Sequence, residues 1–96
     1  MIGKKHNLNG KIIFACCDCE LINTKINHDD AIIEISSDFF GKNKISEKDV
    51  LEAIENCDSA NIFGKRVCDF LIANNQISKD HIIYVGKIPH TQIYKL

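Results

Sequence analysis

The chain closes with H-I-I-Y-V-G-K-I-P-H-T-Q-I-Y-K-L, residues 81–96, and this stretch predicts the strands that complete a sheet. It is apolar and β-branched on both sides of one interruption, at Gly86–Pro89. Proline removes a ladder donor and fixes φ, so we expect Pro89 to end one strand and His90 and Gln92 to begin the next. Residues i and i+2 of a strand share a face, so these two polar side chains should project together from the bend.

The N-terminal third predicts further strands. Met1–His6 and Lys11–Cys17 flank Asn9-Gly10, which is a strong signal for a two-residue hairpin. The second of these segments is apolar without alternation, as is typical of a central strand that is covered on both faces. Two further segments are a turn at Asn27–Asp30 and a third strand at Ala31–Ser36.

The middle of the chain predicts two helices. Ser46 and Asp49 form a capping-box variant at the start of the first helix, whose apolar residues recur at helical spacing. This stripe is Val50, Ala53, Ile54 and Cys57. Asp58 or Ser59 should cap a second helix that runs as far as Asn74. Its stripe is Phe63, Val67, Phe70, Leu71 and Asn74, and Gly64 lies inside it.

Strands therefore precede and follow a pair of helices, in the order strand-strand-strand-helix-helix-strand-strand. Segregated elements of this kind favour an α+β fold over an alternating one. We expect a small sheet of about four to five mostly antiparallel strands, with the two-helix hairpin packed on one face. Residues 1–96 should form a single α+β domain, since a chain of this length holds one core.

Composition limits the classes of function. The formal net charge is −1, with lysine and arginine spread along the chain, so bulk attraction to nucleic acid or membrane is not expected. No apolar run approaches the ~20 residues that span a bilayer, and no signal-peptide core follows Met1. The sequence therefore predicts a cytoplasmic protein that does not bind membranes, with five cysteines kept as reduced thiols.

Three short motifs follow one another along the chain. They are C-D-x-E-L at residues 17–21, N-I-x-G at 61–64 and G-x-I-P-H-x-Q at 86–92. In this order the motifs resemble the archaeal domain of unknown function 424 family, and the last of them is the most specific. The chain departs from the family pattern at Thr91, where alanine is usual, and near Asn75, where a glycine is usual. The resemblance covers essentially the whole chain, implies an archaeal cytosolic protein and brings no established activity.

The cysteines Cys16, Cys17 and Cys19 suggest a metal site, for which Cys17 and Cys19 are weak candidates. On a strand these two share a face and Cys16 points away, whereas tetrahedral zinc needs four ligands, or three and a water. Cysteine also serves as a small apolar core residue, so we expect no metal and no other cofactor. As a nucleophile, Cys17 would need a base such as His90, because the neighbouring charge of Asp18 raises a thiol pKa.

The remaining candidates are polar and charged residues with two interpretations each. His90 and Gln92 offer donors and acceptors suited to a base edge or a backbone, or they tie down a buried turn. Asp18 and Glu20 are binding carboxylates, or solvated charges at the end of a strand. The candidate binding residues are Pro89, His90, Gln92, Asp18, Glu20 and the basic pair Lys65 and Arg66.

We expect a non-enzymatic binding module, a monomer or weak homodimer, whose partner is RNA or a translation-associated protein. The alternative is a thiol- or metal-dependent enzyme, or a metal-binding protein, centred on Cys17 and His90. Two observations separate these hypotheses. RNA binding is favoured by a shared face for Lys65, Arg66, Lys87 and Lys95. The alternative is favoured by convergence of Cys17, Cys19 and His90 within the reach of one ligand.

Overall fold

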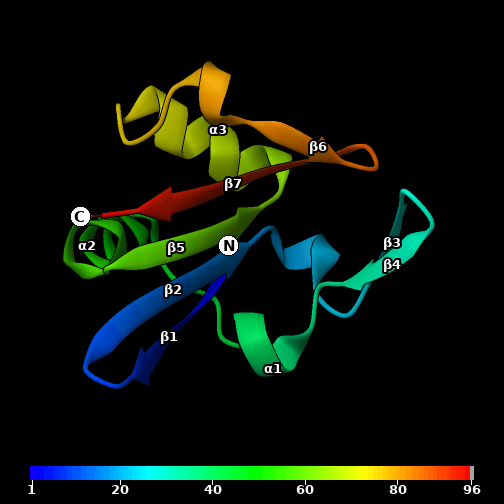
Figure 1. The fold of residues 1–96 in the computed structure, drawn as a ribbon. Coiled ribbons are helices and arrows are strands. Elements are labelled where there is room, and N and C mark those ends of the chain that lie inside the picture. The colour runs from blue at the N-terminus through cyan, green and yellow to red at the C-terminus, as the bar shows by residue number, and fades with distance from the viewer. Residues whose placement is uncertain (96) are drawn as a thin grey trace.

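A computed structural model describes residues 1–95 of the chain, and Leu96, the last residue of the closing stretch, lies outside the described residues. The strands are β1 (Ile2–Leu8), β2 (Lys11–Cys17), β3 (Lys25–His28), β4 (Ala31–Glu34), β5 (Ser59–Phe63), β6 (Ile83–Val85) and β7 (Ile88–Tyr94). The helices are α1 (Ser37–Phe40), α2 (Glu47–Asn56) and α3 (Lys65–Ala73), with 3-10 turns η1 (Cys19–Leu21) and η2 (Lys79–His81) (Figure 1).

Five of these strands form one mixed sheet in the order β1-β2-β5-β7-β6, while β3 and β4 pair only with each other. The pairing of β2 with β5 is parallel and the other pairings are antiparallel. A parallel pair needs a long crossover connection, and here that connection contains α2. The α+β class is therefore confirmed, whereas the predicted order and number of strands are wrong.

The principal error lies in the segment predicted as the second helix. Ser59–Phe63 is the central strand β5, and only Lys65–Ala73 is helical, so the predicted two-helix hairpin does not exist. Ile62 and Phe63 are buried on opposite faces of the sheet, which is the environment of a central strand. Gly64 has φ +123°, a value that an α-helix interior cannot hold, so this glycine separates strand from helix.

The first hairpin and the first long helix follow the sequence prediction. Asn9 and Gly10 both have positive φ, as a type I′ turn requires, and Leu8 pairs with Lys11 across it. The Ser46 side chain accepts a hydrogen bond from the Asp49 backbone N–H at 3.1 Å and so caps α2. The predicted stripe Val50, Ala53, Ile54 and Cys57 is buried.

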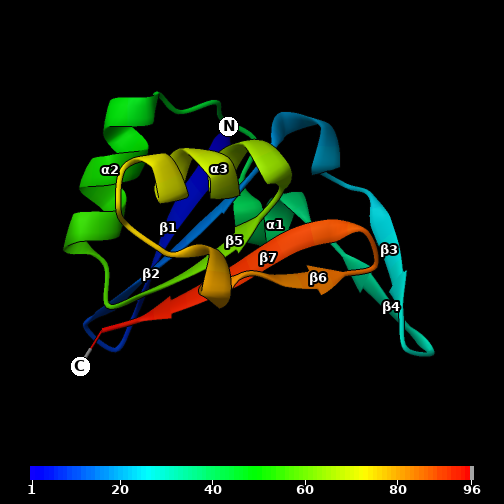
Figure 2. The same cartoon turned by 90° about the horizontal axis from the view of Figure 1, so that it is seen from above.

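Side chains of successive β2 residues enter two cores, one on each face of the sheet. Phe14 and Cys16 pack beneath α2 and α3, which lie together on one side of the sheet (Figure 2). Ala15 and Cys17 face the other side, where α1 and the connections around β3 and β4 cover part of the sheet. The prediction that this strand is covered on both faces is confirmed.

The third predicted strand forms, but outside the main sheet. Ala31–Glu34 pairs with Lys25–His28 around Asp29 and Asp30, both at positive φ, and this hairpin projects past the turn between β6 and β7 (Figures 1 and 2). Most of its side chains are exposed, and Ile26 and Ile33, which pair across the hairpin, pack against the core on the α1 side of the sheet. In residues 1–95 no helix has both the length and the apolar character required to cross a membrane.

Candidate functional site

Asp18 follows the last residue of β2. It caps α3, the helix that follows the neighbouring strand β5. Its carboxylate accepts hydrogen bonds from the backbone N–H groups of Arg66, at 3.0 Å, and Val67, at 2.9 Å. A Cβ atom on Gly64 would lie 2.4 Å from the Asp18 Cγ, so only glycine fits at this junction. A negative charge at a helix N-terminus is favourable, because it meets free N–H donors and the positive end of the helix dipole. Asp18 is buried, and its backbone N–H donates to the Phe63 carbonyl at 3.1 Å, which joins the motif at residues 17–21 to the motif at 61–64.

The charged candidates near α3 form exposed pairs. Arg66 Nε lies 3.8 Å from the Glu20 carboxylate, and Lys65 Nζ donates to the Asp69 carboxylate at 2.7 Å. The hydrogen bond from Lys65 to Asp69 raises the pKa of the lysine above its ordinary value. Exposed pairs of this kind contribute little to stability, so all four side chains can exchange partners with a ligand.

His90 lies in β7 and is buried. Its Nδ1 donates a hydrogen bond to the Ile62 carbonyl at 2.8 Å, and its ring stacks on Phe63 with 4.0 Å between centroids. Burial is the larger influence on this imidazole and lowers its pKa, against the opposing effect of the bond to Ile62. The neutral form of His90 is therefore favoured in the folded protein.

Gln92 points to the same face of β7 as His90 but is exposed. It donates from Nε2 to the Asn61 Oδ1 at 2.9 Å, and Tyr94 donates from its hydroxyl to the Gln92 Oε1 at 3.1 Å. His90 pairs with Phe63 and Gln92 with Asn61 along β5. The two candidates thus have different surroundings, and their role as binding residues stays a prediction.

Pro89 does not end a strand, so the predicted bend there is wrong. It lies within β7, where its carbonyl accepts a hydrogen bond from the Gly64 N–H at 2.9 Å. The chain reverses earlier, at Gly86 and Lys87, because Gly86 supplies the positive φ of +63° that a two-residue hairpin turn needs. Pro89 is the second residue of β7, so the N–H that proline lacks is missing only near the start of this strand.

The cysteines do not assemble into one site. Cys16 and Cys17 belong to the cores on opposite faces of the sheet, and Cys19 lies in η1. Burial raises the pKa of both Cys16 and Cys17 to about 12, with the charge of Asp18 adding to the effect at Cys17. Residues 1–95 contain no group of three or more His, Cys, Asp or Glu side chains able to hold a metal ion.

A groove with a volume of about 540 Å³ lies between α3, η2 and the β6–β7 hairpin. Its floor is apolar and consists of Leu21, Cys68, Ile72, Ile82, Ile88 and Pro89. Its rim carries Lys65, Lys79, Lys87, Asp69 and Tyr84. We call this hollow the α3–β7 groove. Tyr84 and Pro89 are directly paired across the hairpin, so both face the groove.

The α3–β7 groove is electropositive although the chain is not. Three lysines and one aspartate surround it, on a protein with a formal net charge of −1. Within residues 1–95 neither Lys79 nor Lys87 takes part in an ion pair. Lys65 and Lys87, singled out from the sequence, meet here, and Lys79 joins them. Lys95 lies elsewhere, where its Nζ donates to the Glu55 carbonyl at 2.7 Å.

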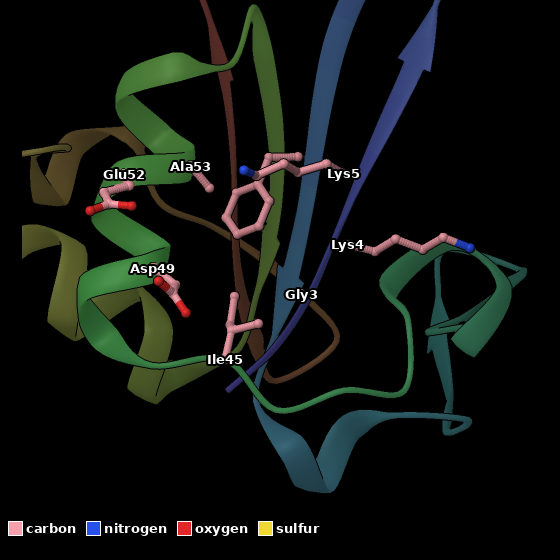
Figure 3. Close-up of a pocket in the computed structure, with 8 residues that line it drawn as sticks. Gly3, Lys4, Lys5, Ile45, Asp49, Glu52 and Ala53 are labelled. Carbon is pink, nitrogen blue, oxygen red and sulfur yellow. The ribbon is translucent and has the colours of Figure 1, made fainter.

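A second hollow of about 200 Å³, the β1–α2 pocket, lies at the opposite edge of the sheet (Figure 3). Its charged lining residues are Lys4, Lys5, Asp49 and Glu52, two of each sign. Lys5 turns toward α2, whereas Lys4 turns to the other side of β1 (Figure 3). The Lys4 Nζ donates to the Asp38 carbonyl on that other side, so one lysine and two carboxylates face the pocket, which does not favour an anion.

Lys79 and Tyr84 are members of the α3–β7 groove that the sequence does not predict. Lys79 stands in a polar connector and Tyr84 in a strand three residues long, and neither carries a local motif. They become neighbours of Lys65 only because the β6–β7 hairpin returns alongside α3. No single residue type marks this site in the sequence, because its members come from α3, η2 and β6.

The fold and the groove define a small α+β protein with a mixed five-stranded sheet and a lysine-lined groove beside its last helix. The chain matches the family model described as protein of unknown function DUF424 over residues 6–96, and it belongs to this family. No curated protein matches the chain.

A solved structure with the same fold is a crystal structure described as an uncharacterized conserved protein from the archaeon Methanopyrus kandleri. The similarity has a TM-score of 0.83 at 20% sequence identity and covers 97% of this chain and 89% of that one. At this identity the likeness concerns the fold alone.

Proposed function

We propose that the chain is a non-enzymatic binding module that binds RNA in the cytoplasm through the α3–β7 groove. The observation that supports this most is the gathering of Lys65, Lys79 and Lys87 around one apolar-floored groove of a chain with net charge −1. Lysines neutralise phosphates and release their counterions, so a local basic cluster supplies binding energy that the net charge does not.

A binding role is also supported by the surroundings of Asp18, Cys17 and His90, the side chains that an enzyme would use. Asp18 is engaged by two backbone N–H groups of α3, and the thiol of Cys17 has a pKa of about 12. The Nδ1 of His90 is engaged by the Ile62 carbonyl. A nucleophilic thiol must ionise near the working pH and a general base must reach its substrate, so the raised pKa of Cys17 and the burial of His90 both favour a structural role.

RNA is favoured over an acidic protein surface by the mixed character of the groove. Lysines at a rim, an aromatic ring and an apolar floor together suit a nucleotide, which has a charged backbone and an apolar base face. An acidic protein, for example a translation-associated one, would use the lysines and leave the floor of Ile72, Ile82 and Pro89 without a partner.

The test is the salt dependence of RNA affinity, measured by fluorescence anisotropy with a labelled oligonucleotide from about 50 to 200 mM salt. A double variant, Lys79→Gln with Lys87→Gln, should bind more weakly. Its slope of log K against log salt should fall by about 1.4, since each single-stranded phosphate contact contributes about 0.7. The matched control is Lys5→Gln in the β1–α2 pocket, which removes a lysine outside the groove. RNA affinity unchanged in the double variant would contradict the proposal.

A further inference from the structure

The α3–β7 groove has an apolar floor that would have no partner if RNA contacted the protein through its phosphates alone. Six apolar residues lie below the lysines, and Tyr84 stands at the rim with 62% of its surface exposed. A duplex presents phosphates and riboses on its outside and keeps its base faces stacked within. An unpaired base, in contrast, offers an apolar face that can leave water against such a floor.

We infer that the groove binds single-stranded RNA, with one unpaired base held between Tyr84 and the apolar floor and its flanking phosphates at Lys79 and Lys87. This inference rests on the proposed function and gives the form of the RNA. Exposed aromatic rings beside basic residues are the usual means of holding single strands, because every base has a face on which a ring can stack.

The size of the groove agrees with one nucleotide. Its volume of about 540 Å³ lies in the range of small-ligand sites, about 300–1,000 Å³. The paired positions of Tyr84 and Pro89 place an aromatic ring beside an apolar one on the same side of the hairpin. A base that enters beside Tyr84 therefore meets apolar surface on more than one side, while the lysines remain at the rim for its phosphates.

The surroundings of the groove disfavour a duplex. The His28 Nδ1 accepts a hydrogen bond from the Gly86 N–H at 3.3 Å, which holds the β3–β4 hairpin against the β6–β7 turn. Asp29 and Asp30 are exposed at the tip of that hairpin, close to the Lys87 end of the groove. A rigid duplex that overhangs the turn would meet these carboxylates, whereas a flexible single strand can bend away from them.

The test compares oligouridine of about 12 nucleotides with an RNA duplex of the same length, by anisotropy at one salt concentration. We expect the single strand to bind at least about tenfold more tightly. Tyr84→Ala should weaken single-strand binding about five- to a hundredfold, the effect of losing one stacked base, with the salt slope unchanged. Tyr84 is exposed, so the variant should fold, and a thermal melt checks this.

The matched control is Tyr94→Ala. Tyr94 is 72% exposed and lies in β7 outside the groove, so its loss should leave the affinity unchanged. Equal affinity for strand and duplex, or a Tyr94→Ala variant weaker than Tyr84→Ala, would overturn this inference and leave the proposed function standing. The lack of any salt-dependent RNA binding in the unaltered protein would overturn the proposed function, and this inference with it.

Discussion

The α3–β7 groove and the β1–α2 pocket are built alike and differ in character. Each lies on the helix-covered side of the sheet, and each is lined by a glycine, Gly64 in the groove and Gly3 in the pocket. The groove has an excess of lysines and an apolar floor, whereas one lysine and two carboxylates face the pocket (Figure 3). The two hollows therefore suit ligands of different charge, and only the groove combines free lysines with an apolar floor.

The two glycines sharpen this comparison, because an added Cβ atom would meet a different kind of neighbour at each. A Cβ atom would lie 2.4 Å from the Asp18 Cγ at Gly64, and 2.4 Å from the Ile45 Cδ1 at Gly3. The Asp18 carboxylate is fixed by two hydrogen bonds, whereas Ile45 presents the free end of a flexible side chain. The wall of the groove should thus be the more rigid of the two.

The largest expected effect is that of Gly64→Ala on stability. The positive φ of Gly64 strains any other residue, and the clash would displace the cap of α3, so the variant should lose about 2–5 kcal/mol of unfolding free energy. Gly3→Ala should lose only about 1 kcal/mol, because the end of Ile45 can turn aside and the Phe14 ring, 3.0 Å from the new Cβ, needs to shift only slightly. Urea denaturation of both variants measures the difference. Equal losses would show that the junction of Asp18 with α3 is not rigid.

A second comparison lies within β7, between His90 and Gln92. His90→Ala leaves the Ile62 carbonyl without its side-chain donor and removes a ring stacked on Phe63, so it should cost about 1–3 kcal/mol. Gln92→Ala changes an exposed side chain and should alter stability by less than about 0.5 kcal/mol. The two melting curves, with RNA binding measured on the same samples, separate a structural from a binding role. Unchanged stability with lost binding in both variants would move the binding site to this face.

The smallest expected effect concerns pH. The folded protein lowers the pKa of His90, so the unfolded chain binds a proton more readily than the folded one. The stability contributed by neutral His90 is present above the unfolded pKa of about 6.5 and is lost as the pH falls toward the lower folded value. Unfolding free energy should thus fall less between pH 7 and pH 5 in His90→Gln than in the unaltered protein. If the unfolding free energy falls equally in the variant and in the unaltered protein, the titration of His90 does not cause the fall.

Local patterns predicted those elements whose structure depends on local chemistry. The Asn9-Gly10 turn and the Ser46 cap follow from the backbone preferences and hydrogen bonding of those residues. The unalternating segment around Phe14 was correctly predicted as a strand covered on both faces. In these places the residue types and the tertiary structure favour the same conformation.

The errors arose where distant contacts override a local pattern. Ser59–Phe63 fits a helical stripe, yet its place between β2 and β7 makes it a strand. Gly64 is the one local feature that argues against a helix over this segment, because a glycine inside a helix is costly. The groove could not be predicted, because Lys79, Tyr84 and Lys65 meet only once the β6–β7 hairpin lies beside α3. Side chains that a hairpin brings together leave no periodic signal in the sequence.

The most direct test of the central claim is an NMR titration of the ¹⁵N-labelled protein with oligouridine, followed through its amide chemical shifts. We expect the largest shifts at residues of the α3–β7 groove, around Lys65, Lys79 and residues 84–87, while the β1–α2 pocket around Asp49 stays unchanged. Shifts concentrated instead around Asn61, Gln92 and Tyr94, on the uncovered face of the sheet, would contradict it.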